Sequence, residues 1–476
     1  MLHYFPKYFS TRATNCYLLV ILAVVAIFPS NTMPLYMYLI GTGSVVLFFF
    51  YGSNNLSKRW LLLHPKLFER KIFRTAFWLR LAWAIFIYFF NIERYGTPNG
   101  SSVLDAGWYL ELAEDGLNLV KEGNWNVFST WISWGIDIPD AGYAYWLFLV
   151  YLLSGHFSPF ILPLVLKCLL SAQCCVWIYR IGKMHFGEST GRLAAIFCVL
   201  DAMLIWYSGS MLKETEMIFL SVAFIHSSDL ALRNPPKVKN FIWPFLLILA
   251  IFTFRAALAA VAFISLFLTA VFTSSKVTTP FKKGALIAGL LVILAFSINN
   301  MILGNITEGT ETGEILTEQS ANMAWRAERE GGNSFAKYAG ATVFAPLIFT
   351  IPFPSMTYTT EDQEMLMELN GGYFIKNVMS FFVILALFTL LFSGQWRAHV
   401  LPIAFTCGYL MALVLSVYAQ SGRFHMPIIP FELLFAAFGV SQMDVRKAKW
   451  FNWVLVAEFF ICIAWQWFKL KGKGLL

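Results

Sequence analysis

Long apolar runs, separated by shorter polar segments, cover most of this 476-residue chain. Most of them approach the length of about 20 residues that an α-helix needs to cross the hydrocarbon core of a bilayer. Residues 241–273 are too many for one straight helix and predict a hairpin, with Arg255 near its outer turn. The pattern predicts an all-α integral membrane protein, a polytopic helical bundle of about 13 spans. The other predicted spans cover residues 14–29, 34–51, 76–91, 160–178, 192–208, 216–232, 284–300, 373–393, 401–419, 427–442 and 452–468.

Two long polar segments, at residues 91–140 and 301–340, interrupt the apolar pattern. The first carries many acids, and an amphipathic stretch follows its Asp105, which predicts juxtamembrane helices outside the bilayer. Residues 144–153 form a run too short to cross comfortably, as is typical of a re-entrant or interfacial helix. Residues 341–354 are apolar but broken by three prolines. Because irregular backbone at membrane depth is tolerated only inside protein or beside a cavity, this run is predicted to border a cavity.

The composition indicates the same class of protein. Hydrophobic residues make up 58% of the chain and charged residues 13%, whereas soluble domains are about 45–50% apolar and about 25% charged. No basic patch with interleaved aromatic residues lies in a polar domain, which argues against nucleic-acid binding. The seven cysteines lack zinc-ligand or disulfide-framework spacing. No metal-ligand motif, nucleophile elbow or phosphate-binding glycine loop is present, so no cofactor is predicted, and a divalent metal stays an open alternative.

The distribution of Lys and Arg predicts the orientation, because basic residues gather in cytoplasmic loops. Residues 52–75 and 274–283 are basic and are predicted to be cytoplasmic, as is the amino terminus, whose apolar runs predict retained helices and no cleaved signal. Residues 91–140, 209–215 and 301–340 then face outward. For the last four spans the basic residues divide four against four, so charge alone leaves their orientation open.

Asp105 is the first candidate for chemistry. Asp is favoured at a helix N-cap, and the periodic apolar positions begin just after this residue, so one interpretation is a structural cap. The other is a general base on the outer face, because a carboxylate can accept the proton of an attacking hydroxyl or amine within hydrogen-bond reach.

Four basic residues and one acid form the other candidates. Lys167 lies inside an apolar run, where an ionisable group indicates function unless the side chain snorkels to the interface. Lys213 and Glu214 share a short outer loop, where both also fit an ordinary solvated loop. Arg255 sits in an apolar hairpin, where an unpaired charge is costly. Arg423 opens a proline-containing phrase late in the chain.

The order of several short phrases resembles a known family. Taken together, they resemble the GT-C class of polyprenyl-phosphate-sugar-dependent glycosyltransferases, which includes protein O-mannosyltransferases and lipid A aminoarabinose transferases. The phrases are DAGWYLELAEDGL from Asp105, the apolar helix with Lys167, YRIGKMHFG, SGSMLKETEMIFL with Lys213 and Glu214, FTFRAALAA with Arg255, and RFHMPIIP from Arg423.

This resemblance implies a membrane enzyme that moves a sugar from a polyprenyl-phosphate donor to a glycan, lipid or protein acceptor on the outer face. Asp105 would be the base, and Glu214 would orient the acceptor or support Asp105. The resemblance also places Arg423 outside and suggests a bacterial inner membrane. The substrate-binding residues it implies are Tyr109, Lys167, Lys213, Arg255 and Arg423.

The resemblance divides the chain into three parts: an extra transmembrane hairpin with a basic loop over 1–75, a catalytic membrane module over 76–300, and a variable membrane module over 301–476. Two alternatives stay open. A polysaccharide polymerase or ligase would depend on Arg326 and Arg329 in the second polar segment. A transporter or flippase would show internal repeats and broken helices at matched positions.

Overall fold

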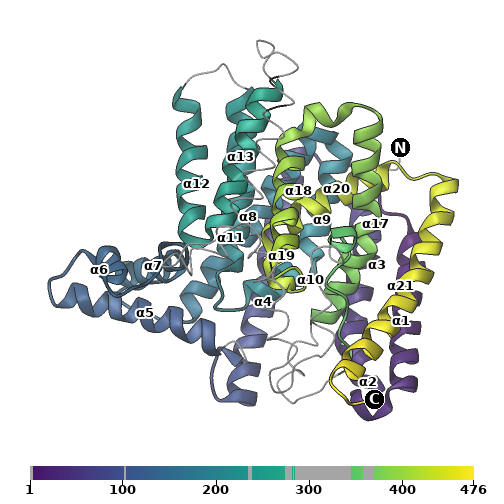
Figure 1. Cartoon of the computed structure of the whole chain (residues 1–476), viewed down its shortest axis with the longest axis horizontal. Coiled ribbons are helices and arrows are strands. Elements are labelled where there is room, and N and C mark those ends of the chain that lie inside the picture. The colour runs from purple at the N-terminus through teal and green to yellow at the C-terminus, as the bar shows by residue number, and fades with distance from the viewer. Residues whose placement is uncertain are drawn as a thin grey trace, which may run out of the picture.

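The computed structural model describes residues 4–100, 103–233, 238–273, 345–357, 369–416 and 418–476, together with residues 281 and 284. In these ranges the chain is mostly helical, and no β-strand is present in them. The long helices pack side by side as one bundle (Figure 1). The prediction of an all-α protein is confirmed for the part of the chain that the structure describes.

Ten segments in the described ranges are long and apolar enough to cross a membrane, or eleven if a bent pair is counted as one span. They indicate a multi-pass integral membrane protein. The predicted span at 284–300 lies outside the described residues apart from Gly284, so the total of about 13 stays a prediction. The ten segments are α1 (Lys7–Ile27), α2–η2–α3 (Leu35–Arg59), α4 (Pro65–Tyr95), α8 (Ile161–Phe186), α11 (Glu214–Arg233), α13 (Ala256–Thr273), α17 (Asn370–Phe392), η8–α18 (Gln395–Leu415), α19–η9–α20 (Gly422–Ser441) and α21 (Val445–Gly472).

The basic segment predicted as a loop over 52–75 is helical at both ends. Helix α3 continues to Arg59, and α4 begins at Pro65, a residue whose fixed φ suits the first helical position. The intervening turn is held by the Arg192 guanidinium, which donates to the carbonyl oxygens of Trp60 (2.8 Å) and Leu61 (3.0 Å). The long aliphatic stems of Lys and Arg let a charged stretch stay helical, which the charge pattern alone does not reveal.

The span predicted at 192–208 is instead a bent pair, α9 (Glu188–Leu200) and α10 (Ala202–Ser208), with a 52° bend. Asp201 caps α10 by accepting a hydrogen bond from the Leu204 amide (2.9 Å). The fully buried Arg80 donates to the carbonyl oxygens of Cys198 (2.9 Å) and Val199 (3.3 Å), which the bend leaves without helical partners. The bend therefore depends on a distant arginine that the local sequence does not show.

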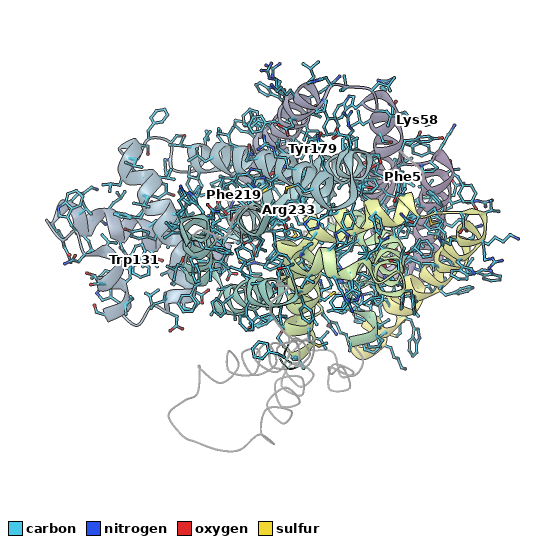
Figure 2. All side chains as sticks on the ribbon, turned by 90° about the horizontal axis from the view of Figure 1, so that it is seen from above. Phe5, Lys58, Trp131, Tyr179, Phe219 and Arg233 are labelled. Atoms are coloured by element: carbon cyan, nitrogen blue, oxygen red, sulfur yellow. The ribbon has the colours of Figure 1, made fainter. Side chains whose placement is uncertain are left out.

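Three helices extend from one side of the bundle: α5 (Val103–Lys121), α6 (Val127–Ser133) and α7 (Ile138–Ser154), with α5 running across the direction of the long helices (Figure 1). Figure 2 labels Trp131 of α6 within this unit, where its ring is buried against Tyr145 and Phe148 of α7. The predicted short helix at 144–153 is present but longer. It joins the bundle where Gly142 packs on α12 (Ile242–Phe254), since a Cβ there would lie 2.7 Å from the Thr253 carbonyl oxygen.

The hairpin predicted within 241–273 is confirmed. Helices α12 and α13 pack on each other, and Arg255 lies between them in an extended conformation. The proline-broken run is irregular over most of 345–357, with carbonyl groups held by Lys376, whose Nζ lies 3.0 Å from the Phe349 oxygen and 2.8 Å from the Ile351 oxygen. The segment thus satisfies its backbone inside the protein, as irregular backbone in a membrane must.

Candidate functional site

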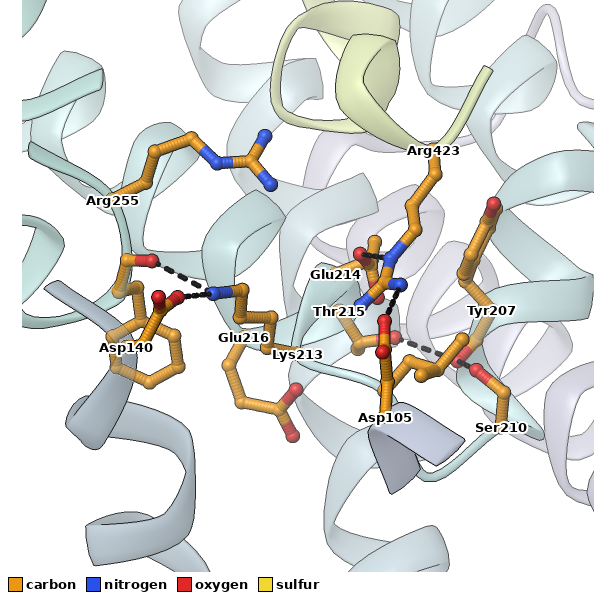
Figure 3. A network of polar contacts seen from close by, with 12 residues as sticks. Asp105, Asp140, Tyr207, Ser210, Lys213, Glu214, Thr215, Glu216, Arg255 and Arg423 are labelled. Carbon is orange, nitrogen blue, oxygen red and sulfur yellow. Dashed lines mark hydrogen bonds and ion pairs between the residues drawn. The ribbon is translucent and has the colours of Figure 1, made fainter. Parts of the chain in front are cut away.

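One cavity of about 880 Å³ collects most of the polar candidates. It lies where α5, the first turn of α7, the α12–α13 turn, the end of α18 and the short helix α19 (Gly422–His425) come together. Figure 3 shows the polar network at this place. The lining residues that bear charge or can hydrogen-bond through a side chain are Asp105, Trp108, Tyr109, Asp137, Asp140, Lys213, Arg255, Tyr409, Ser416, Tyr418 and Arg423.

Arg423 joins two carboxylates from different helices. Its Nη1 donates to Oδ2 of Asp105, and its Nε donates to Oε1 of Glu214. The Asp105 side chain is 56% exposed and that of Glu214 only 1%, so the arginine spans from the open cavity to the protein interior. The contact puts Arg423 at the same end of the bundle as the first polar segment. Whether that end faces outward, as the resemblance implies, stays a prediction.

Asp105 is the third residue of α5 and lies in its first turn, not at the N-cap. An acid there still interacts favourably with the helix dipole, but its side chain points to Arg423 (Figure 3). Glu214 begins α11, and its Oε2 is buried without a hydrogen-bond partner among the described residues. The site therefore holds one accessible carboxylate and one buried carboxylate with a free oxygen, both anchored by the same guanidinium.

Lys213 forms a second ion pair in the cavity. Its Nζ lies 2.5 Å from Oδ1 of Asp140 and 3.2 Å from the Phe254 carbonyl oxygen. It also stands over the ring of Tyr109, 5.7 Å from the centroid. Burial lowers the pKa of Lys213, and the Asp140 carboxylate opposes that shift. Burial likewise raises the pKa of Tyr109, so its phenol stays protonated and available as a donor at neutral pH.

Arg255 differs from the other two cavity cations. Its Nη1 donates to the Tyr409 hydroxyl (2.9 Å), and its guanidinium packs 4.2 Å from the centroid of the Phe424 ring. Within the described ranges, no carboxylate forms an ion pair with it. A partly exposed guanidinium in a cavity, held by a phenol and an aromatic ring, is a suitable site for an anionic group of a ligand.

No protein-family model, curated protein or solved structure matches this chain. What the cavity can do is therefore inferred from its own side chains.

Lys167 is placed elsewhere. It is fully buried, does not line the cavity, and its Nζ lies 2.9 Å from Oε2 of Glu216. It also donates to the Tyr143 hydroxyl (3.4 Å) and to the Leu212 carbonyl oxygen. Its ammonium thus supports the turn that carries Lys213 and does not point into the cavity, although the resemblance implied a substrate-binding role for Lys167.

Two of the cavity residues that the sequence analysis missed contact the predicted cations directly. Asp140 looked like one of many acids in the first polar segment, yet it sits in the first turn of α7, as Asp105 does in α5. An acid at the start of a predicted helix is therefore the sequence feature that could have identified Asp140. Tyr409 lay unremarked inside an apolar run, and no local pattern marks its contact with Arg255 across 154 residues. Within the described part of the chain, no group of three or more His, Cys, Asp or Glu residues is arranged to hold a metal ion.

Proposed function

We propose that this chain is an integral membrane glycosyltransferase that takes a sugar from a polyprenyl-phosphate-linked donor. The observation that carries the proposal is that one cavity holds both the accessible carboxylate of Asp105 and the guanidinium of Arg255, which has no carboxylate partner among the described residues. A carboxylate can take the proton of an acceptor, and a cation without a carboxylate partner can bind a phosphate. The residues are those that the family resemblance singles out.

The chemistry follows from these two groups. An acceptor hydroxyl or amine attacks the anomeric carbon and forms the new glycosidic bond, and its proton passes to the Asp105 carboxylate. The bond between that carbon and the phosphate oxygen breaks, and its electron pair leaves with the polyprenyl phosphate. Arg255 and Arg423 stand where negative charge grows on the leaving phosphate, which is where fixed cations lower the barrier most.

The cavity also suits the lipid part of such a donor. Its other lining residues are apolar and come from the start of α7, the α12–α13 turn, the end of α18 and α19. A ligand with an anionic head and an apolar tail matches a site that joins three cations to apolar walls. The apolar lining residues are Ile138, Pro139, Phe252, Phe254, Ala256, Ala257, Ala412, Leu413 and Phe424.

A direct assay tests the function. The full chain, purified and reconstituted in liposomes, is given polyprenyl-phosphate donors with radiolabelled sugars, and label released from the lipid is measured with glycan, lipid and protein acceptors. Donor-dependent transfer that Asp105→Asn abolishes supports the proposal. Movement of lipid-linked glycan across the bilayer without transfer would instead favour a flippase, the class in which broken helices such as α9–α10 are common.

We expect Arg255→Met to raise the KM for the donor roughly ten-fold or more, because a hydrogen bond to a charged group contributes about 1.5–3 kcal/mol. The measurement is steady-state transfer at varied donor concentration. Arg397→Met is the matched control, because Arg397 also packs on an aromatic ring, that of Trp396, but lies outside the cavity. Equal donor kinetics in both variants would mean that Arg255 does not hold the phosphate.

The proposal includes a topology: a bacterial inner membrane, a cytoplasmic amino terminus, about 13 spans and the cavity open to the outer side. Cysteines introduced at Leu62, between α3 and α4, and at Glu122, between α5 and α6, would be probed on intact cells with an impermeant thiol reagent. Both positions are exposed, and six of the seven native cysteines are buried. We expect labelling of Glu122→Cys only, and labelling of Leu62→Cys only would reverse the orientation.

A further inference from the structure

The two carboxylates on Arg423 are held very differently. Glu214 contacts Nε at the stem of the guanidinium and is 1% exposed, so water does not compete for it. Asp105 contacts Nη1, at the tip, and its side chain is 56% exposed. A solvent-exposed ion pair contributes little to stability, whereas a buried charge that loses its partner is strongly destabilising. Glu214 is therefore the permanent partner of Arg423, and Asp105 is the exchangeable one.

We propose that the phosphate of the donor replaces Asp105 on Arg423, so that Asp105 is released to the acceptor only after the donor has bound. Arg423 then acts as a positioning residue for the base as well as a phosphate ligand. The inference rests on the proposed function and adds an order of events to it, with the donor first and the acceptor second.

The arrangement around Phe424 brings a phosphate to this contact. Arg255 packs on the Phe424 ring, and Arg423, the preceding residue in the chain, lines the same cavity. Lys213 is engaged by Asp140 and by the Phe254 carbonyl. Lys213 keeps its contact with the Phe254 carbonyl even without Asp140, whereas Nη1 of Arg423 contacts Asp105 alone among the described residues. The tip of Arg423 is therefore the cation that a phosphate bound in this cavity gains by displacing one exposed carboxylate.

The contact between Arg423 and the phosphate, relative to that with Asp105, should become stronger as the reaction proceeds. A guanidinium matches two phosphate oxygens with parallel hydrogen bonds. The phosphodiester of the donor carries one negative charge, and a second charge develops as the sugar leaves, so the contact with Arg423 strengthens toward the transition state. Before exchange, Oδ2 of Asp105 is occupied by the Nη1 proton. After exchange, both carboxylate oxygens are available to accept the proton of an acceptor.

The test is the affinity of the full chain in detergent for farnesyl phosphate, a short polyprenyl phosphate, measured by calorimetry with farnesol as the probe without phosphate. We expect Asp105→Asn to bind farnesyl phosphate roughly two- to five-fold more tightly than the unaltered chain, the range set by an exposed ion pair. Binding of farnesol should not change. An increase in affinity for farnesyl phosphate is the informative result, because altering a residue that merely helps to build the site would lower that affinity.

Two controls isolate the contact. Asp137 lines the same cavity and forms no ion pair with a described residue, so Asp137→Asn measures the general effect of removing one negative charge and should give a smaller gain. In an Arg423→Gln, Glu214→Gln background, which leaves no buried charge unpaired, Asp105→Asn should give no gain. An equal gain in Asp137→Asn, or unchanged or weaker binding in Asp105→Asn, overturns the exchange.

The result separates this inference from the proposed function. If sugar transfer requires Asp105 but the unaltered chain and Asp105→Asn bind farnesyl phosphate equally tightly, the proposed glycosyltransferase function is supported and the proposed exchange is wrong. Absence of phosphate-dependent binding in the unaltered chain, together with absence of transfer from every donor, would overturn both.

Discussion

Asp105→Asn is expected to lower sugar transfer by about 10²-fold or more, the usual scale for loss of a general base. The amide cannot accept a proton at neutral pH, although it has nearly the shape of the carboxylate. Transfer from a polyprenyl-phosphate sugar in liposomes is the measurement. Because the same variant is expected to bind the lipid phosphate at least as well as the unaltered chain, the loss should lie in kcat, with no rise in the KM for the donor.

The fold should tolerate this change. Asp105 is more than half exposed, and its loss removes a dipole interaction of about 0.3–1 kcal/mol at the start of α5. Glu111→Gln is the matched control, since Glu111 is an exposed acid on the same helix that does not line the cavity. Near-normal turnover in Asp105→Asn would transfer the role of base to Glu214, whose Oε2 has no partner among the described residues.

Lys167→Met is expected to destabilise the protein by about 3–5 kcal/mol, because it leaves the Glu216 carboxylate buried without its partner. The thermal unfolding of the detergent-solubilised chain is the measurement. A Lys167→Met, Glu216→Gln double variant removes both charges and should recover most of the lost stability. The recovery is the control, since a substitution that simply fits badly would not be rescued by a change at the facing residue.

This variant also tests the prediction, implied by the resemblance, that Lys167 binds substrate. Unchanged thermal stability together with weakened binding of farnesyl phosphate would show that the ammonium reaches the donor. The structure leads us to expect the reverse, because the ammonium is fully buried and contacts Glu216, Tyr143 and the Leu212 carbonyl.

Hydrophobic periodicity predicted what depends on local sequence. The membrane helices follow from apolar runs, and the α12–α13 turn follows from a run too long for one helix, with its only charge near the middle. The sequence analysis found several residues of the cavity because they are charged and lie at or near the ends of apolar runs. Charged side chains avoid the hydrocarbon core, so those at the same end of neighbouring helices tend to gather there. Asp105, Lys213, Arg255 and Arg423 all belong to this group.

What the sequence could not predict depends on partners far along the chain. Lys167 looked unpaired because Glu216, 49 residues later, shows no sign in the sequence of facing it. The bend between α9 and α10 depends on Arg80, more than a hundred residues earlier, whose guanidinium replaces the lost helical hydrogen bonds. In both cases a long-range contact between buried polar groups decides the outcome, and periodicity carries no information about it.

The carboxylate expected to act as base and the cations expected to hold the phosphate belong to different parts of the molecule. Asp105 lies in the unit formed by α5, α6 and α7, beside the bundle, whereas Arg255 and Arg423 belong to the bundle itself (Figures 1 and 3). The unit meets the bundle through packing such as that at Gly142 and through the ion pairs of Asp105 and Asp140. If the proposed function holds, mutations confined to residues 103–154 could change the acceptor during evolution without altering Arg255 and Arg423, the residues expected to hold the lipid phosphate.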